Sequence, residues 1–93
     1  LAVNFRASPP LYDPDRDVIV LEGQALGERA RFAISGEALD DHFGAEDISE
    51  EGRKNAALAN RAAIEACLSA KFRKAPSPET LLTTDEVPSL RKQ

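Results

Sequence analysis

The sequence predicts one small α+β domain, an antiparallel sheet of three to four strands that one long helix covers, with one short helix besides. Two branched or alternating segments, 17–22 and 28–34, predict neighbouring strands. An alanine-rich segment over 49–74, with capping residues before it and prolines after it, predicts the long helix. The 93 residues are enough for one domain. We expect it to span residues 1–87 in the order β-β-β-α-α-β, followed by a polar tail over 88–93.

The N-terminal region is expected to form a short strand and then a loop. Val3 and Phe5 alternate with polar residues, which predicts a strand over residues 1–6. Residues 7–16 contain three prolines, and proline has no backbone donor. A helix or a central strand is therefore excluded there, and we expect a loop.

The next two segments are expected to pair as an antiparallel hairpin. Val18 to Leu21 is a continuous branched run, which indicates burial on both faces or one uncovered face. Gly23 to Gly27 contains two glycines and is expected to form the turn, a loop of five or six residues. The alternation over 28–34 then predicts the returning strand.

Two helices and a last strand follow. Ser35 is a suitable N-cap for a short helix from Gly36 to Phe43, which Gly44 would end. The long helix begins after an N-cap at either Asp47 or Ser49. It is expected to run to about Lys74, because Pro76 and Pro78 follow. A final strand is expected over 80–83.

Charge is unevenly distributed along the chain, whose net charge is −4. Residues 1–51 carry 4 basic and 12 acidic side chains, a balance of −8, and residues 52–93 carry 8 basic and 4 acidic, a balance of +4. Such asymmetry can mark a nucleic-acid or membrane patch. We favour the simpler interpretation that the two halves neutralise each other within the fold or across a dimer.

The long helix is expected to present a basic face, because residues 52–74 contain six cationic side chains and a single acidic one, Glu65. The basic face consists of Arg53, Lys54, Arg61, Lys71, Arg73 and Lys74. A helix of this kind can lie along phosphates. The pI of about 4.9 and the few aromatic residues argue against nucleic acid as the partner. A membrane is disfavoured as well, because no apolar run approaches the length of a spanning helix.

The sequence offers few groups for catalysis or metal binding. His42 and Cys67 are the only residues of their kinds, so no second histidine supports a metal site. Asp13, Asp15 and Asp17 lack the glycine and distal glutamate of a calcium loop. No phosphate-binding glycine loop or serine elbow is present either. We therefore expect no metal, no cofactor and no enzymatic activity.

The cellular location is expected to be cytoplasmic. One cysteine allows no intrachain disulfide, which is typical of proteins in a reducing compartment. The N-terminus has no basic segment followed by an apolar stretch, so no signal peptide is predicted.

The order and spacing of residues from Asn4 to Asp85 resemble a bacterial family of small proteins, domain of unknown function 1488. The residues that carry the resemblance are Phe5, Tyr12-Asp13, Arg16, Ile19, Leu21, Gly23, Phe32, Ile34, Glu37-Ala38-Leu39, Asn60-Arg61, Ile64, Leu82-Thr83 and Asp85. The chain departs from the family pattern at Pro9-Pro10-Leu11, Ala57 and Glu86, so a site that used those positions would be altered here. The resemblance implies a compact α+β fold in a cytoplasmic bacterial protein, and no activity. It also implies that Ile19 and Leu21 face inward, with Val18 and Val20 on the second face of their strand.

Three functional hypotheses follow. The leading one is a non-enzymatic protein-interaction or regulatory module, with a protein partner or with itself as a homodimer. It is motivated by the scarcity of catalytic groups, the alanine-rich core, the opposed charges of the two halves and the second apolar face. The second is nucleic-acid binding through the basic helix over 52–74. The third is a small-ligand binder or enzyme that uses Tyr12, Asp13 and Arg61, which requires these three to converge on one pocket.

Overall fold

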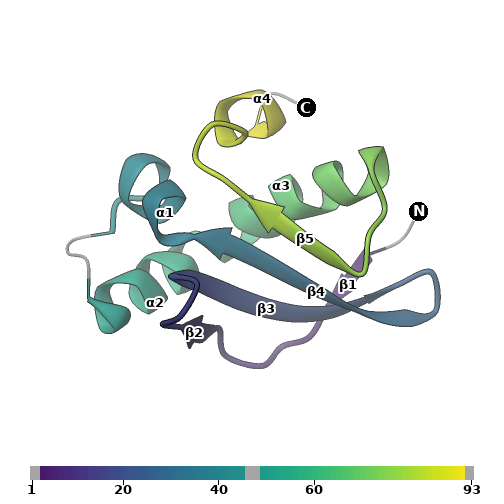
Figure 1. Ribbon diagram of the computed structural model, residues 1–93, viewed down its shortest axis with the longest axis horizontal. Coiled ribbons are helices and arrows are strands. Elements are labelled where there is room, and N and C mark those ends of the chain that lie inside the picture. The colour runs from purple at the N-terminus through teal and green to yellow at the C-terminus, as the bar shows by residue number, and fades with distance from the viewer. Residues whose placement is uncertain (1–2, 46–48, 92–93) are drawn as a thin grey trace.

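The computed structural model describes residues 3–45 and 49–91, which form a five-stranded sheet and four helices. Figure 1 shows β3, β4 and β5 in front, with α2 and α3 behind the sheet. The strands are β1 (Val3–Phe5), β2 (Leu11–Asp13), β3 (Val18–Ala25), β4 (Glu28–Ser35) and β5 (Glu79–Leu82). The helices are α1 (Gly36–His42), α2 (Glu50–Ala59), α3 (Arg61–Lys74) and α4 (Val87–Arg91). The predicted α+β class is confirmed.

The sheet is mixed, so the prediction of a wholly antiparallel sheet is wrong. Its strand order is β1-β3-β4-β5, and β2 also pairs with β3. β3 is antiparallel to β1, β2 and β4, whereas β5 is parallel to β4. Three helices separate β4 from β5 in the chain, and a crossover of this length returns the next strand in the same direction.

The β3–β4 hairpin is longer and its turn tighter than the predicted loop of five or six residues. The strands pair as far as Ala25 and Glu28, which leaves Leu26 and Gly27 as a two-residue turn. Their φ angles of 57° and 77° are both positive, as a type I′ turn requires. Gly23 belongs to β3 and not to the turn. A Cβ at this position would lie 2.6 Å from the Asn4 carbonyl oxygen of β1, so the glycine is what allows the two strands to approach closely.

The predicted long helix is interrupted at Asn60, which separates α2 from α3. Asn60 has φ −114° and ψ 20°, outside helical values. Its side-chain nitrogen donates to the carbonyl oxygens of Phe43 at 3.0 Å and Ala56 at 2.9 Å. Ser49 caps α2 by accepting from the Gly52 amide, as one of the two predicted starts requires. The other start, Asp47, lies outside the described residues.

Two elements were not predicted. β2 lies within the proline-containing segment that was expected to be a loop, and proline flanks it on both sides. α4 replaces most of the polar tail expected from Pro88 onward, because Val87 and Leu90 are buried in the core. The predicted short helix is confirmed, with Ser35 as its N-cap and Gly44 at φ 66° just after it.

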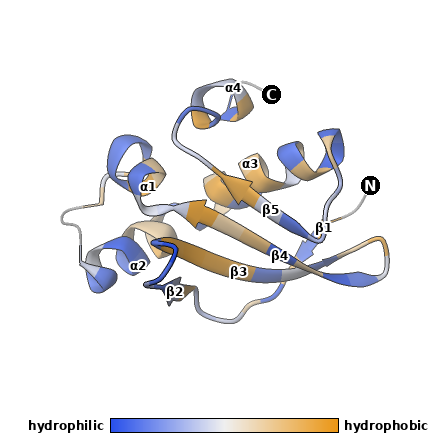
Figure 2. Ribbon diagram, viewed as in Figure 1, coloured by the Kyte–Doolittle hydropathy of each residue, from blue (hydrophilic) through white to orange (hydrophobic). Residues whose placement is uncertain are grey.

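The two faces of the sheet carry separate apolar clusters. The larger one joins Ile19, Leu21, Phe32 and Ile34 to residues of all four helices. Phe32 is fully buried, and its ring lies 4.8 Å from Phe5 and 6.0 Å from Phe72 between centroids. Figure 2 shows the apolar stretches of β3, β4 and β5 side by side.

The smaller cluster consists of Val18, Val20 and Ala33, with Leu81 packed against it, and contains no helical residue. We call this side of the sheet the helix-free face. The expected division of β3, with Ile19 and Leu21 inward and Val18 and Val20 outward, is confirmed. No helix in the described part of the chain has the length and apolarity to cross a bilayer.

Candidate functional site

Tyr12, one of the three residues of the ligand-site hypothesis, is committed to a contact with Asp17. Its hydroxyl donates to Asp17 Oδ1 at 2.8 Å, and this hydrogen bond to a carboxylate raises the pKa of Tyr12. The ring packs against the larger core cluster. Asp17 has a φ of 54°, an uncommon value for a residue other than glycine. Tyr12 thus secures the turn between β2 and β3.

Asp13 and Arg61 have separate partners. Asp13 Oδ1 accepts from the backbone amides of Asp15 at 3.0 Å and Arg16 at 3.4 Å, which closes the β2–β3 turn. Arg61 pairs with Glu65 at 2.8 Å and donates to two carbonyl oxygens of the β1–β2 connection, those of residues 6 and 8. No hydrogen bond joins one of the three predicted ligand residues to another within 3–45 and 49–91.

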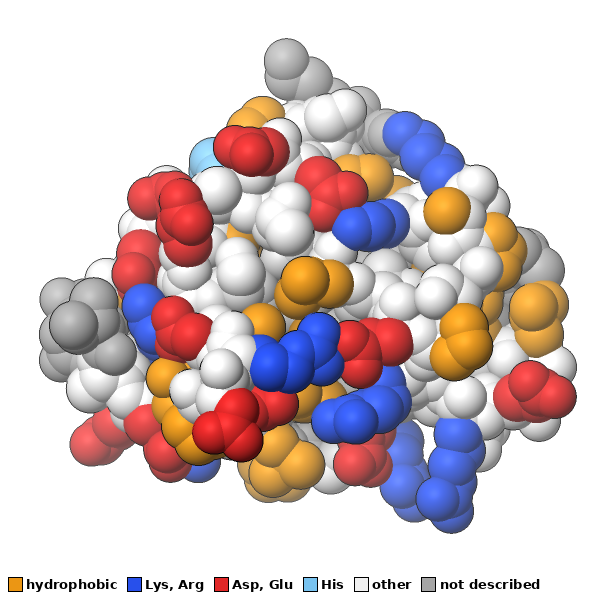
Figure 3. Space-filling view, viewed as in Figure 1, with side chains coloured by type: hydrophobic (Ala, Val, Ile, Leu, Met, Phe, Trp, Pro, Cys, Tyr) orange, Lys and Arg blue, Asp and Glu red, His pale blue; other side chains and the backbone are white. Residues whose placement is uncertain are grey.

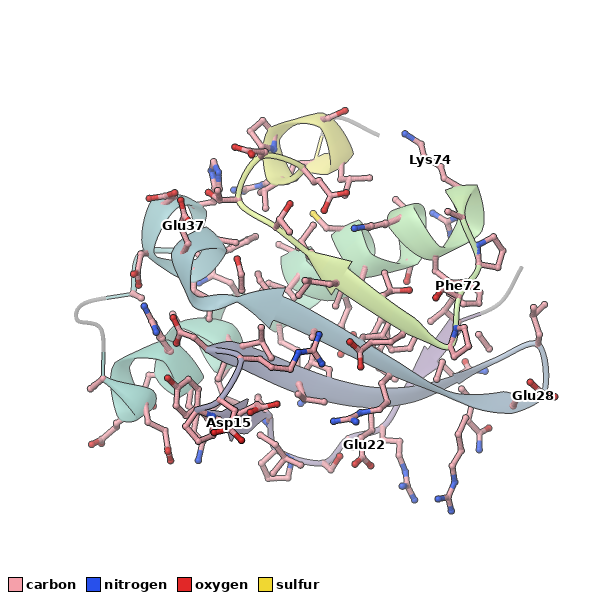
Figure 4. All side chains as sticks on the ribbon, in the orientation of Figure 1. Asp15, Glu22, Glu28, Glu37, Phe72 and Lys74 are labelled. Carbon is pink, nitrogen blue, oxygen red and sulfur yellow. The ribbon has the colours of Figure 1, made fainter. Side chains whose placement is uncertain are left out.

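The six residues of the predicted basic face do not share one exposed surface. Arg53 is buried, Arg61 is held as described above, and Lys71 binds the Glu86 carboxylate at 2.7 Å and the Leu81 carbonyl oxygen. Lys54 forms an exposed pair with Glu50 one helical turn away. Arg73 and Lys74 are exposed at the end of α3, where Lys74 projects away from the sheet (Figure 4). The prediction that all six lie on the outer side of one helix is therefore wrong for Arg53, which is buried.

Arg53 connects three elements from a buried position. Its guanidinium donates to Asp17 Oδ1 in the β2–β3 turn and to Asp40 Oδ2 in α1, the latter at 3.1 Å. It also lies against Gly36, where an added Cβ would meet the guanidinium carbon at 2.5 Å. Burial opposes the charge, but the hydrogen bond to Asp40 and the field of the two carboxylates leave the pKa of Arg53 raised. The helical pattern alone could not reveal this inward position.

The helix-free face is ordered in two rows that cross the strands. Val20 of β3 is in register with Ala33 of β4, and one step along the same face Glu22 is in register with Arg31. The first row, which we call the apolar row, consists of Leu11, Val20, Ala33 and Leu81. The second row, which we call the charged row, consists of Glu22, Arg31 and Glu79.

An ion pair crosses this face and covers part of the apolar row. Arg16, in the β2–β3 turn, donates to Glu79 Oε1 of β5 at 2.6 Å. β3 and β4 lie between those elements in the sheet, so the two side chains span both strands. This accounts for exposed fractions of only 6% at Val20 and 1% at Ala33 on a face without helices. The hydrogen bond from Arg16 lowers the pKa of Glu79.

A groove of about 720 Å³ opens beside this ion pair. It is lined by polar and apolar groups of β2, β3 and β4 and of adjoining loops, among them Arg6, Leu11, Val20, Glu22, Arg29 and Arg31. Figure 3 shows the same face, with basic, acidic and apolar side chains interspersed across it. Arg6 pairs with Glu22 at 3.3 Å. Arg29 and Arg31 form no ion pair with any carboxylate of the described chain.

The free edge of β5 is occupied by side chains. Ser77 binds the Glu79 amide and Lys71 the Leu81 carbonyl, and just beyond the strand Glu86 binds the Thr83 amide. At the opposite edge β1 and β2 are three residues each, and prolines separate them. Edges blocked in this way are poor templates for an added strand. A partner would therefore meet the sheet on its face.

Comparison with known proteins identifies the family. Residues 3–80 match the model of the family described as Protein of unknown function (DUF1488). No curated protein and no solved structure matches the chain. Within the described residues, no group of three or more histidine, cysteine, aspartate or glutamate side chains is arranged to hold a metal ion.

Proposed function

The chain belongs to the family of proteins of unknown function DUF1488, and we propose that it is a non-enzymatic protein-interaction module that binds its partner on the helix-free face. The groove on that face carries the proposal. It combines an apolar row with arginines that have no ion-pair partner in the described chain. Interfaces use this combination, because apolar contact supplies affinity and arginine supplies directed hydrogen bonds.

The two other hypotheses, nucleic-acid binding and a small-ligand site, are supported less well by the geometry. Nucleic-acid binding through the helix over 52–74 relied on six exposed cations, of which Arg53, Arg61 and Lys71 are engaged inside the fold. A ligand site of Tyr12, Asp13 and Arg61 relied on convergence, and Arg61 does not line the groove on which the other two border.

Site-specific photo-crosslinking in cells tests the proposal. A photoreactive amino acid would replace Leu11, which is 54% exposed beside the groove. The matched control is Leu58, which is 52% exposed on α2, on the opposite side of the sheet. We expect discrete protein adducts from position 11 and none from position 58. The same adducts from both positions, or none from either, would refute the proposal.

Self-association is part of the same proposal. A second copy of the chain is one protein partner, and it would give an adduct at twice the 10.1 kDa mass of the chain. Sedimentation of the purified chain measures this directly. A strict monomer at high micromolar concentration excludes the homodimer and leaves a different protein as the partner.

A further inference from the structure

Arg29 and Arg31 form a pair with a fixed spacing on the helix-free face. They are alternate residues of β4, so both side chains stand on the same side of the strand, roughly 7 Å apart. Both are exposed. The register with Gln24 and Glu22 of β3 places them beside the groove that they line. The backbone that sets this spacing is paired with β3 at both arginines, and at Arg31 with β5 as well.

Two of the acids on this face already have cationic partners. Glu22 is paired with Arg6, and Glu79 with Arg16. Asp13 accepts two backbone hydrogen bonds and keeps its charge, so it is a single acid beside two unpaired arginines. Arg29 and Arg31 therefore leave an excess of positive charge on this face, in a chain whose net charge is −4. The excess lies next to the apolar row, where Leu11 is exposed.

We propose that the groove recognises an extended segment of a partner protein with acidic side chains at two alternate positions and an apolar side chain further along. An extended segment repeats its side chains on one side at the spacing of the arginine pair, so two carboxylates could each meet one guanidinium. The apolar side chain would then lie on Leu11, which is exposed at the groove. This inference rests on the proposed function and adds the chemistry of the partner.

A nucleic acid fits this surface less well than an acidic segment of protein. Glu22 and Glu79 flank Arg31 in the charged row, so the unpaired positive charge of this face is confined to two arginines and does not extend into the continuous basic track that a run of phosphates requires. Tyr12 is the one aromatic residue along the groove, and its ring is packed against the core with its hydroxyl bound to Asp17. The groove thus has no free ring on which a base could stack.

Fluorescence anisotropy with designed peptides tests the inference on the full chain. The probe is a labelled Gly-Glu-Thr-Glu-Thr-Leu-Thr-Gly peptide, and its control has glutamine in place of both glutamates. We expect saturable binding of the acidic peptide that weakens as salt is raised. The glutamine peptide should bind at least about tenfold more weakly, because two charge-assisted contacts are lost.

Two double variants locate the binding. Arg29→Glu with Arg31→Glu reverses the charge of the pair, and Arg73→Glu with Lys74→Glu makes the same change of net charge at the end of α3. The first should weaken binding of the acidic peptide by about tenfold or more, and the second should change it less than about twofold. Arg29→Gln with Arg31→Gln, checked for folding by circular dichroism, repeats the test without introducing negative charge.

Several outcomes would overturn the inference. They are equal binding of the two peptides, equal effects of the two charge reversals, and groove-dependent binding of a single-stranded oligonucleotide in preference to the peptide. A dimer of the wild type that the Arg29→Glu, Arg31→Glu variant abolishes would identify a second copy as the occupant instead. Adducts from Leu11 without binding of the acidic peptide would overturn the inference and leave the proposed function standing. Peptide binding without any adduct would refute the proposed function and, with it, the inference about the partner.

Discussion

The two faces of the sheet are built from alternate residues of the same strands, yet they are closed in different ways. On the helical side, Ile19, Phe32 and Ile34 are fully buried beneath packed side chains of the helices. On the helix-free face, Val20 and Ala33 form a small cluster without helical residues, and the exposed ion pair of Arg16 and Glu79 crosses this face. A packed apolar layer is hard to open, whereas an exposed ion pair contributes little to stability. The difference suggests that one face maintains the fold and the other is available for contacts.

Two arginines illustrate the same difference. Arg53 is on the helical side, buried, and bound to two carboxylates from separate elements. Arg31 is on the helix-free face, exposed, and without an ion pair in the described chain. Substitutions can therefore separate stability from binding, and the following four are ordered from the largest expected effect on stability to the smallest.

The largest effect is expected from Phe32→Ala on the helical side. Phe32 is fully buried between Phe5 and Phe72, so the substitution leaves a cavity that the backbone of an inner strand cannot close. We expect the free energy of unfolding to fall by about 3–5 kcal/mol, measured by urea denaturation. A loss below about 1 kcal/mol would show that this face is not the one that holds the fold together.

The second effect is expected from Arg53→Met, which keeps an unbranched apolar stem and removes the guanidinium group with its charge. Two carboxylates, those of Asp17 and Asp40, lose their shared partner. The unfolding free energy should fall by roughly 2–3 kcal/mol. Lys54→Met is the matched control, because it removes an exposed pair on the same helix and should cost under about 0.5 kcal/mol. Equal losses from the two variants would contradict the structural role of Arg53.

The third effect depends on pH and concerns Glu86, which links β5 and α4 to α3. Burial opposes its charge, but hydrogen bonds from Lys71 and Thr83 leave the pKa of Glu86 below its ordinary value of 4.5. A lowered folded pKa stabilises the fold above the unfolded pKa, and this contribution is lost as pH falls through the folded pKa. Because the side chain is 36% exposed, Glu86→Gln should cost under about 1 kcal/mol at neutral pH.

The difference between wild type and Glu86→Gln should shrink as pH is lowered from 7 to about 3 in parallel urea titrations, since glutamine does not titrate. A difference that stays constant over this range would mean that the charge of Glu86 does not contribute. Lys71→Gln removes the cation that pairs with Glu86, so the difference in unfolding free energy between this variant and wild type should also shrink at low pH.

The smallest effect on stability is expected from Arg31→Gln on the helix-free face. The side chain is exposed and has no ion pair to lose in the described chain, so the unfolding free energy should change by less than about 0.5 kcal/mol. Binding of the acidic peptide should nevertheless weaken. A stability loss comparable to that of Arg53→Met would remove the distinction between the two faces.

Much of the fold could be predicted because local rules and the packing agreed. The alternation over 28–34 and the N-cap at Ser35 are properties of neighbouring residues, and so is the cap at Ser49, one of two predicted starts; each is confirmed. The inward position of Ile19, which the family resemblance implied, is confirmed as well. The direction of β5 depends on how three helices cross the sheet, which no local pattern contains. The break at Asn60 likewise depends on the carbonyl of Phe43, 17 residues away.

The site was harder to predict than the fold. Arg53 and Arg73 look alike in the helical pattern, but one is buried against Gly36 and the other is exposed. Gly36 is the one residue of the sequence that could have indicated this position of Arg53, since a glycine in the first turn of a helix leaves room for a neighbouring side chain. From the alternation over 28–34, Arg29 and Arg31 can be predicted only to lie on the polar side of a strand. Their importance depends on the absence of a helix over that side, which follows from the tertiary arrangement.

Cys67 has a practical consequence. It is the single cysteine of the chain, 1% exposed within the larger core cluster, and burial raises its pKa. Both properties suppress reaction with thiol reagents in the native state. The rate of alkylation therefore reports how often the packing of α3 and α4 around Cys67 opens enough to expose the thiol. A slower alkylation of Cys67 when a ligand is bound in the groove would show that binding on the helix-free face stabilises the packing on the helical side.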